Sequence, residues 1–306
     1  MASLAAPAPA EAHLRSGTIA VDYAATIAHA SAPAYSARIY QSDHGLQLTL
    51  HPGHTITLIG YVGEPVFRLD ASGLWINAAS PTAAVTGLLK KAKRIASTAP
   101  HWRLRRGQYA ASWHDARAQG LPPGIDRGDW RVPLVADGRP MMLTGSLRRF
   151  PAPSLVLWIA LLASATAVGW ATAVAGDAAN IERAAGWLAF EAAAAATTVA
   201  LVFALDSYAS PGTWIAAGDE IAIIAVGIGL LVKGPPNLRL AGVIGLGLMA
   251  LAVGLVHGSV FFHPIVLAPL PSTVTRALTL AGIAAGIDAA ALGCFAYLRD
   301  GPSLHP

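Results

Sequence analysis

The chain has 306 residues, a formal net charge of +4 and a single cysteine, Cys294. One cysteine excludes an intramolecular disulfide and a metal site built from several thiolates. Residues 1–150 hold 16 of the 21 lysines and arginines, whereas residues 151–306 supply most of the apolar runs. This break in composition predicts two domains, at 13–150 and 151–306, that face different solvents.

Residues 1–12 look like the end of a signal peptide, although a basic start and an apolar stretch of about 7–15 residues are missing. Ala10-Glu11-Ala12 fits an A-x-A cleavage site, after which His13 would be the new N-terminus. We therefore expect a signal-peptide remnant or a disordered start at 1–12. The alternative is a cytoplasmic N-terminal domain with the opposite topology.

Residues 13–150 read as short alternating strands separated by turn residues, which is typical of an antiparallel β-sandwich. In GLQLTL (45–50), for example, Leu46, Leu48 and Leu50 share one face. The other expected strands are 18–23, 36–41, 55–60, 66–69, 74–77, 108–113, 129–135 and 141–147.

His51 and His54 enclose a Pro52-Gly53 pair in the segment HPGH. Pro suits position i+1 of a type II turn and Gly suits i+2, so we expect the histidines to end two paired strands, with Cα atoms under ~7 Å apart. That separation allows two imidazoles to share a metal ion. It equally allows two solvated histidines at a hairpin tip, and both interpretations stay open at this point.

Residues 81–97 break the strand pattern, since their apolar residues recur at helical spacing. The segment also carries Lys90, Lys91, Lys93 and Arg94. A basic amphipathic helix can lie on anionic lipid, but a solvated helix packed on the sheet is the simpler expectation. No nucleic-acid recognition motif is present, so no nucleic-acid partner is expected.

Residues 151–306 contain five apolar stretches near the ~20 residues that a membrane-spanning helix requires. They lie at about 154–175, 184–205, 215–232, 240–256 and 277–298. Barrel strands would alternate in polarity and these runs do not, so we predict a five-helix transmembrane bundle in contact with membrane lipids. Gly282 and Gly286 form a G-x-x-x-G pair, which we expect to serve packing within the bundle rather than a dimer.

Positive charges in short loops mark the cytoplasmic side of a membrane protein. With residues 1–150 outside, the outer loops carry only Arg276, while Arg148 and Arg149 before the first helix argue against this orientation. The inner segments then carry Arg183, Lys233, Arg239 and Arg299. The balance predicts a multi-pass cell-membrane protein with an extracytoplasmic N-terminal domain and a cytoplasmic C-terminus.

Two acids lie inside the expected spans at similar depths, Glu191 in the second and Asp288 in the fifth. Such acids are costly and are candidates for a transport or proton-relay role, and two of them at one depth tend to share a proton. Alternatively each is neutral and hydrogen-bonded, or Glu191 meets Arg183. A candidate cation site at the outer mouth consists of Asp219 and Glu220, expected to begin the third helix, with His257 and His263, although interfacial anchoring is the simpler interpretation.

Four segments precede the first expected membrane helix: GYVGEPVFRLDASGLWINAASPTA (60–83), WRLRRG (102–107), WHDARAQGLPPG (113–124) and WRVPLVADGRP (130–140). The series resembles a family of actinobacterial integral membrane proteins with an exported β domain and a C-terminal helical bundle. The resemblance covers roughly residues 13–275. Members often accompany copper-handling proteins of the CopC and YcnI kinds. The resemblance therefore implies that the protein binds copper and that an exported copper-handling protein is its partner.

Relatives often read W-H-D-H-R-x-H where this chain has W-H-D-A-R-A-Q (113–119). This chain keeps His114 but has Ala116 and Gln119 at the other two histidine positions. The segment AHLRSG is similar to the mature start of CopC-type proteins, which implies copper binding by the amino group and ring of His13 after cleavage. Imidazole suits copper and zinc among divalent metals.

No nucleophile–base constellation, P-loop, dinucleotide fingerprint or H-E-x-x-H is present, so we do not expect an enzyme. The first hypothesis is a membrane-anchored extracytoplasmic protein that binds, senses or delivers copper. The second is a structural or partner-docking membrane protein without a metal role.

Overall fold

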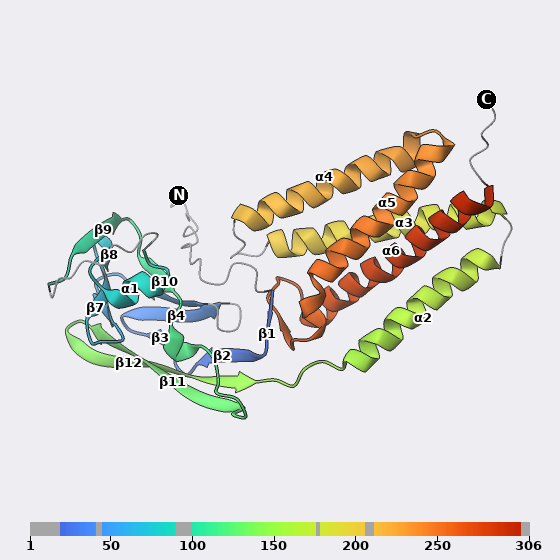
Figure 1. The fold of residues 1–306 in the computed structure, drawn as a ribbon. Helices are drawn as coiled ribbons and strands as arrows, with labels where there is room; N and C mark the ends of the chain where they lie inside the picture. Colours follow the sequence, from blue (N-terminus) through green and yellow to red (C-terminus); the bar gives the residue numbers. More distant parts are fainter. Residues whose placement is uncertain (1–18, 41–44, 90–98, 176–177, 206–210, 301–306) are drawn as a thin grey trace. The chain divides into compact units, whose positions relative to one another are not determined.

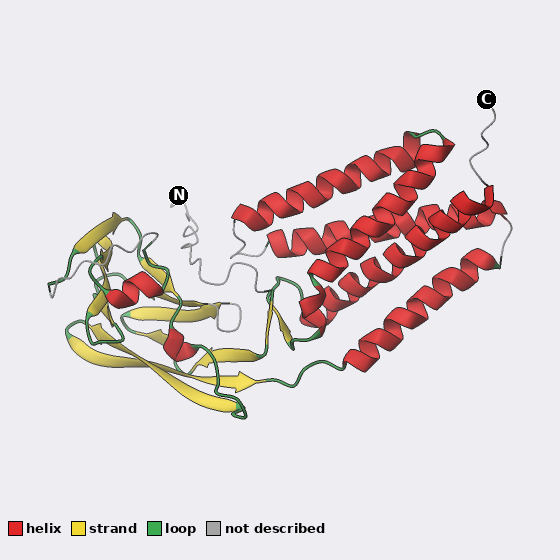
Figure 2. Cartoon of the chain, in the orientation of Figure 1, coloured by secondary structure: helices red, strands yellow, loops and turns green. Residues whose placement is uncertain are grey.

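The computed structural model describes residues 19–40, 45–89, 99–175, 178–205 and 211–300. The chain divides into two compact units, Met1–Pro151 and Ala152–Pro306. Strands dominate the first unit and long helices dominate the second, as Figure 2 shows.

The first unit contains a four-stranded and a seven-stranded antiparallel sheet (Figure 1). The strand order is β10-β5-β4-β3 in the smaller sheet and β2-β12-β11-β6-β7-β8-β9 in the larger one. The strands are β1 Ala20–Val21, β2 Tyr23–Ile27, β3 Ser31–Ala32, β4 Tyr35–Tyr40, β5 Gly45–Leu50, β6 Ile56–Ile59, β7 Pro65–Asp70, β8 Gly73–Asn77, β9 Trp102–Arg106, β10 Ala110–Trp113, β11 Arg127–Ala136 and β12 Arg139–Arg149.

Both sheets contribute side chains to one hydrophobic core. Phe67 on β7 and Trp113 on β10 meet edge to face, with 5.2 Å between ring centroids, and neither is exposed. Along β11, Trp130, Val132 and Leu134 are buried, because every second side chain of a strand points to the same face. Full burial of each large apolar side chain contributes about 1.5–3 kcal/mol.

The antiparallel β unit confirms the coarse prediction: the strand expected at 45–50 is found with the same bounds, and the other expected strands are found with shifted bounds. The strand expected at 18–23 is instead divided between β1 and β2. Sequence patterns missed β3 and β9. The sequence of β9, WRLRR, is strongly basic, and it forms one edge of the larger sheet, where charged side chains discourage pairing with another chain.

The HPGH segment forms a turn but not a hairpin. Pro52 and Gly53 are turn residues, and Gly53 has a φ of +85°, which glycine adopts without steric cost. However, β5 pairs with β4 and β10, whereas β6 pairs with β7 and β11. The expectation that His51 and His54 end paired strands is therefore wrong, because this turn carries the chain from one sheet to the other.

The helix expected at 81–97 is much shorter in the part that the structure describes. Helix α1 spans Pro81–Val85, and the Ser80 side chain caps it by accepting the Ala83 N–H. Gly87 follows with a φ of +78°, a conformation that ends helices. Residues 90–98, which include the four basic residues of this segment, lie outside the described residues.

The second unit is built from long helices. They are α2 Leu155–Val174, α3 Ala178–Ala204, α4 Pro211–Lys233, α5 Pro236–Val256 and α6 Ser272–Asp300, with the 3-10 helix η2 Gly258–Phe261 and the short strand β13 Ile265–Val266 between α5 and α6. Helices α3 to α6 are long and apolar enough to cross a membrane, by length and composition. Among the described residues, α2 supplies a shorter apolar stretch, Leu155–Ala171, so the fifth span stays a prediction.

Helix α6 packs against α2, α3 and α5. Gly282 faces Ala195 on α3, and Gly286 faces Gly247 on α5, where an added Cβ at Gly286 would lie 2.7 Å from the Gly247 carbonyl oxygen. The G-x-x-x-G pair therefore brings backbones together inside the bundle, as predicted.

Candidate functional site

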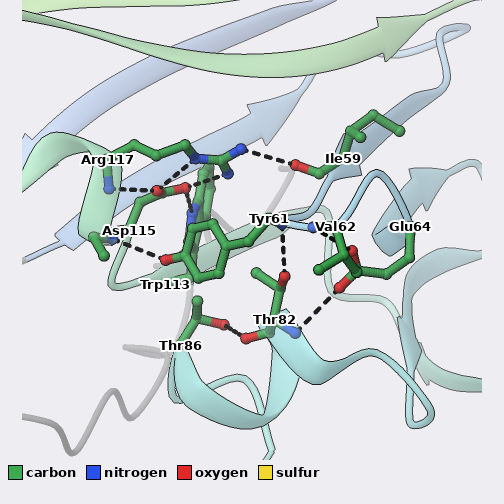
Figure 3. Close-up of polar contacts among 10 residues, drawn as sticks. Ile59, Tyr61, Val62, Glu64, Thr82, Thr86, Trp113, Asp115 and Arg117 are labelled. Atoms are coloured by element: carbon green, nitrogen blue, oxygen red, sulfur yellow. Dashed lines mark hydrogen bonds and ion pairs between the residues drawn. The ribbon is translucent and has the colours of Figure 1, made fainter.

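The two motif segments GYVGEP and WHDAR lie side by side in the first unit (Figure 3). The first forms the turn between β6 and β7, and the second runs from β10 into the 3-10 helix η1 (Ala116–Ala118). The Ala116 N–H donates to the Tyr61 hydroxyl at 2.9 Å, and the Arg117 guanidinium lies 4.9 Å from the centre of the Tyr61 ring. Burial raises the pKa of Tyr61, and the charge of Asp115 raises it further.

Asp115 is the buried anion of this cluster, with 1% of its surface exposed. It accepts hydrogen bonds from the Trp113 indole at 2.9 Å and from the Arg117 backbone N–H at 3.0 Å. The Arg117 Nε and Nη2 atoms donate at 2.8 and 2.7 Å in a bidentate pair. Arg117 Nη1 also donates to the Ile59 carbonyl at 3.2 Å, so the pair ties η1 to β6.

The Glu64 carboxylate is held in a similar way. Its Oε1 accepts from the Ser80 hydroxyl at 2.8 Å and the Thr82 N–H at 3.1 Å, and its Oε2 accepts from the Val62 N–H at 3.3 Å. Burial raises the pKa of Glu64, but hydrogen bonds from the Thr82 and Ser80 side chains and from the backbone N–H groups of Glu64 and Thr82 outweigh burial and hold that pKa below its usual range. An added Cβ at Gly60 would overlap the Glu64 carboxylate, so a side chain here would displace the carboxylate from its donors.

Both carboxylates are therefore occupied by donors from the chain itself. Thr82 links the two halves of the cluster, because its hydroxyl accepts the Tyr61 N–H at 2.8 Å and its carbonyl accepts the Thr86 hydroxyl at 2.8 Å. The result is a rigid turn that leaves Val62 at its tip 74% exposed.

His114 follows β10 directly and is buried, with 6% exposure. Its backbone N–H donates to the Thr86 carbonyl at 3.1 Å. Ala116 begins η1 and Gln119 caps its end, so these two positions lie at opposite ends of a single helical turn. Across the described ranges, no three or more His, Cys, Asp or Glu side chains gather as a metal-binding group.

The rings of His51 and His54 are fixed by two different oxygen atoms. His51 Nδ1 lies 2.9 Å from the Pro33 carbonyl oxygen, and His54 Nδ1 lies 2.7 Å from Asp137 Oδ2. Carbonyl and carboxylate oxygens only accept hydrogen bonds, so Nδ1 carries the hydrogen in each ring. In the neutral imidazole, Nε2 then keeps its lone pair and is the atom able to bind a metal.

Sequence reasoning missed Asp137, the partner of His54. Asp137 and Gly138 form the two-residue loop between β11 and β12, with φ values of 50° and 75°, as Asp-Gly hairpin turns require. The hydrogen bonds from His54 and then from the Thr55 N–H lower the pKa of Asp137. The Asp-Gly pair signals the hairpin, but its approach to His54 depends on the pairing of β6 with β11.

The two acids of the helical unit lie in unlike surroundings. Asp288 on α6 is 1% exposed, whereas Glu191 on α3 is exposed. Among the described residues, Asp288 Oδ1 has no hydrogen-bond partner, and an electrostatic interaction couples Asp288 to Glu191. Asp288 also faces Gly169 on α2. No described ion pair joins Glu191 to Arg183.

The acids expected at the start of the third span lie deeper in their helix. Helix α4 begins at Pro211, so Asp219 and Glu220 occupy its third turn. His257 caps α5, as expected, and stacks on the Phe203 ring with 4.7 Å between centroids. Its Nδ1 lies 2.8 Å from the Val253 carbonyl oxygen, and an electrostatic interaction links it to Glu220.

Arg276 was expected in an outer loop, but it lies inside α6 and is 6% exposed. Its guanidinium donates at 2.7 Å to each of three carbonyl oxygens, those of Val260, His263 and Pro264. These carbonyls replace water around the charge, so Arg276 holds the α5–α6 connection in place and is not a free loop charge. The expected approach of the His263 ring to Asp219, Glu220 and His257 stays a prediction.

His13, the remaining candidate ligand, lies outside the described residues.

Comparisons with protein-family models, curated proteins and solved structures give no match. The class of this protein therefore rests on its own architecture: an antiparallel β unit followed by helices, four of which are long and apolar enough to cross a membrane.

Proposed function

We propose that this chain is a multi-pass membrane protein whose β unit lies outside the cytoplasm and binds copper through His51 and His54. The observation that carries the proposal is the fixed orientation of both rings, with Nδ1 donating to an oxygen acceptor. Metal-bound histidines almost always donate their second ring N–H to a carboxylate or carbonyl in this manner. The Nε2 atoms that remain suit copper.

The site has two protein ligands within the described residues. The turn keeps the Cα atoms of His51 and His54 within ~7 Å, and Asp137 orients the second ring at 2.7 Å. The remaining coordination positions are filled by water or by a donor from another molecule. Such an open site suits the receipt and delivery of copper, because a donor atom of another molecule can bind the copper ion without first replacing a histidine.

The membrane arrangement proposed here has five spans, α2 to α6, and a sandwich of the two sheets. Helix α2 is 20 residues long, which at ~1.5 Å per residue matches a hydrocarbon core of ~30 Å. The shared core of the two sheets supports the sandwich. An odd number of spans puts the two ends of the chain on opposite sides, with Arg183, Lys233, Arg239 and Arg299 on the cytoplasmic side.

The test is a Cu(II) titration of the full chain in detergent, followed by electron paramagnetic resonance. The double variant His51→Ala/His54→Ala should lose tight binding and the imidazole signature of the spectrum. The matched control is His29→Ala/His101→Ala, which removes two exposed histidines elsewhere in the β unit and should bind as the wild type does. Equal binding by both double variants would exclude HPGH as the copper site.

A single change next to the ligands tests the orientation argument. Asp137→Asn keeps the shape of the side chain but removes the charge that receives the His54 N–H. Loss of such a supporting carboxylate typically weakens metal binding about 10- to 100-fold. Unchanged Cu(II) affinity in Asp137→Asn would show that the His54–Asp137 bond only stabilises the turn.

A second candidate function, docking of a protein partner, is favoured by the rigid turn at Tyr61 and Val62. Val62 is 74% exposed, and Val85 on α1 is 58% exposed. Exposed apolar side chains on a preorganised segment are typical of binding surfaces. Val62→Ser with Val85→Ser should abolish co-purification of the exported copper-handling partner that the resemblance implies. Unchanged co-purification would exclude this surface.

A further inference from the structure

Asp288 stands out among the buried groups of the helical unit. It lies near the middle of α6 and only 1% of its surface is exposed. Its Oδ1 atom has no hydrogen-bond partner among the described residues. Helix α6 is one of the four helices that are long and apolar enough to cross a membrane, so this carboxyl group is remote from water at both helix ends.

Helix α2 packs on α6 where Asp288 lies, and the contact is made by a residue without a side chain. An added Cβ at Gly169 would overlap Asp288 Oδ2. The sequence of α2, LVLWIALLASATAVGWATAV, contains no charged residue. On the α2 side, Asp288 therefore meets the backbone at Gly169, and α2 offers it no charged residue.

The other two helices that pack on α6 do not supply a cation next to Asp288 either. Helix α3 contributes Glu191, which interacts electrostatically with Asp288 and is itself an acid. The remaining charged residues of α3, Glu182 and Arg183, lie near its start. In α5 the charged residue is Arg239, near the helix start, where its Nε donates to the Gly234 carbonyl at 2.6 Å.

An ionised carboxylate in this position would be shielded from bulk water, and it would lack a countercharge and a described donor on one oxygen. Burial of a charge under these conditions is strongly unfavourable, and a second acid nearby adds like-charge repulsion. Backbone N–H groups cannot compensate, because a spanning helix uses them for its own hydrogen bonds. A bound proton removes the charge and gives the carboxyl group a donor of its own.

We propose that Asp288 is an intramembrane proton-binding site, closed on one side by α2 at Gly169. The ligand is a proton, and Glu191 on the exposed face of α3 is the neighbouring group with which that proton can exchange. The site lies in the helical unit and does not depend on copper binding by His51 and His54, so either proposal can fail while the other stands.

The test is infrared spectroscopy of the full chain in lipid vesicles at neutral pH. A protonated carboxyl group gives a C=O band separate from that of a carboxylate, and the wild-type spectrum minus that of Asp288→Asn should isolate the band of Asp288. The matched variant Glu191→Gln should keep this band. Absence of the band from the difference spectrum would overturn the assignment. A protonated-carboxyl band that is lost in Glu191→Gln but kept in Asp288→Asn would overturn it as well.

A second measurement needs no variant. A hydrophobic carbodiimide reacts with protonated carboxyl groups in apolar surroundings, so labelling followed by peptide mass spectrometry of the wild-type chain should modify Asp288. Asp115 is an internal control, because it is equally buried but engaged by Arg117. Equal labelling of Asp288 and Asp115, or labelling of neither, would contradict the proposal.

Discussion

Asp115 in the β unit and Asp288 in the helical unit are both 1% exposed, yet their surroundings are opposite. Asp115 receives hydrogen bonds on both oxygens, three of them from Arg117. Asp288 has an oxygen without a partner in the described structure and faces a glycine. Asp115 is thus a carboxylate whose charge is compensated by the chain itself, whereas the burial of Asp288 is not compensated in this way.

The difference has a physical origin in the two kinds of backbone. Around Asp115 the chain turns, so backbone N–H groups and the side chain of Arg117 two residues later are free to point at the carboxylate. Around Asp288 every element is a helix, whose N–H groups are already bonded within the helix. An acid in such a bundle can be neutralised only by a side chain, a proton or another cation.

Removal of Arg117 should give the largest effect. Arg117→Ala leaves the Asp115 carboxylate buried without its bidentate partner, which typically costs about 3–5 kcal/mol in unfolding free energy. Pulse proteolysis of the full chain in urea, read on fragments of residues 1–150, measures this cost. Arg131→Ala, which removes an exposed arginine, should stay within about 0.5 kcal/mol of the wild type.

Neutralisation of Asp115 without a change in shape should have a smaller effect. In Asp115→Asn one carboxylate oxygen becomes an NH₂ group that faces N–H donors, so we expect a loss of about 1–3 kcal/mol by the same assay. A variant as stable as the wild type would mean that the Arg117 pair contributes little, and the contrast with Asp288 would lose its basis.

The acid dependence of stability should come in part from Glu64. Its pKa is lower in the folded chain than the ordinary value, so its stabilisation is complete above the unfolded pKa of about 4.3 and is lost as the pH falls through the folded value. Glu64→Gln should cost about 1 kcal/mol at neutral pH. The variant should also lose less stability than the wild type between about pH 5 and pH 3; identical slopes would contradict the assignment.

The smallest change is expected for Asp288→Asn in the helical unit. A protonated aspartic acid and an asparagine are both neutral and similar in shape, so the free energy of unfolding in detergent should change by no more than about 0.5 kcal/mol. Thermal unfolding monitored by circular dichroism measures it. A loss as large as that of Asp115→Asn would mean that Asp288 is an ionised partner of a group that stabilises the bundle.

Local patterns predicted many elements of both units. Alternation located β5, β7 and β8, and the runs of apolar residues located α2 to α6. Local patterns failed where tertiary pairing decides. The hairpin expected at HPGH became a connection between sheets, and the helix expected from residue 81 stops at Val85 because Gly87 adopts a positive φ. Arg276 was assigned to a loop because its three carbonyl partners cannot be read from the sequence.

The sequence by itself determined the two-part composition, the turn at Pro52-Gly53 and the presence of acids within apolar helices, because each follows from residue type and local spacing. Only the tertiary structure decided which partners those residues meet. The pairing of β6 with β11 brings Asp137 to His54, 83 positions away in the chain. The packing of α2 on α6 through Gly169 buries Asp288 while Glu191 stays exposed. Such contacts depend on sheet order and helix packing, which no local pattern encodes.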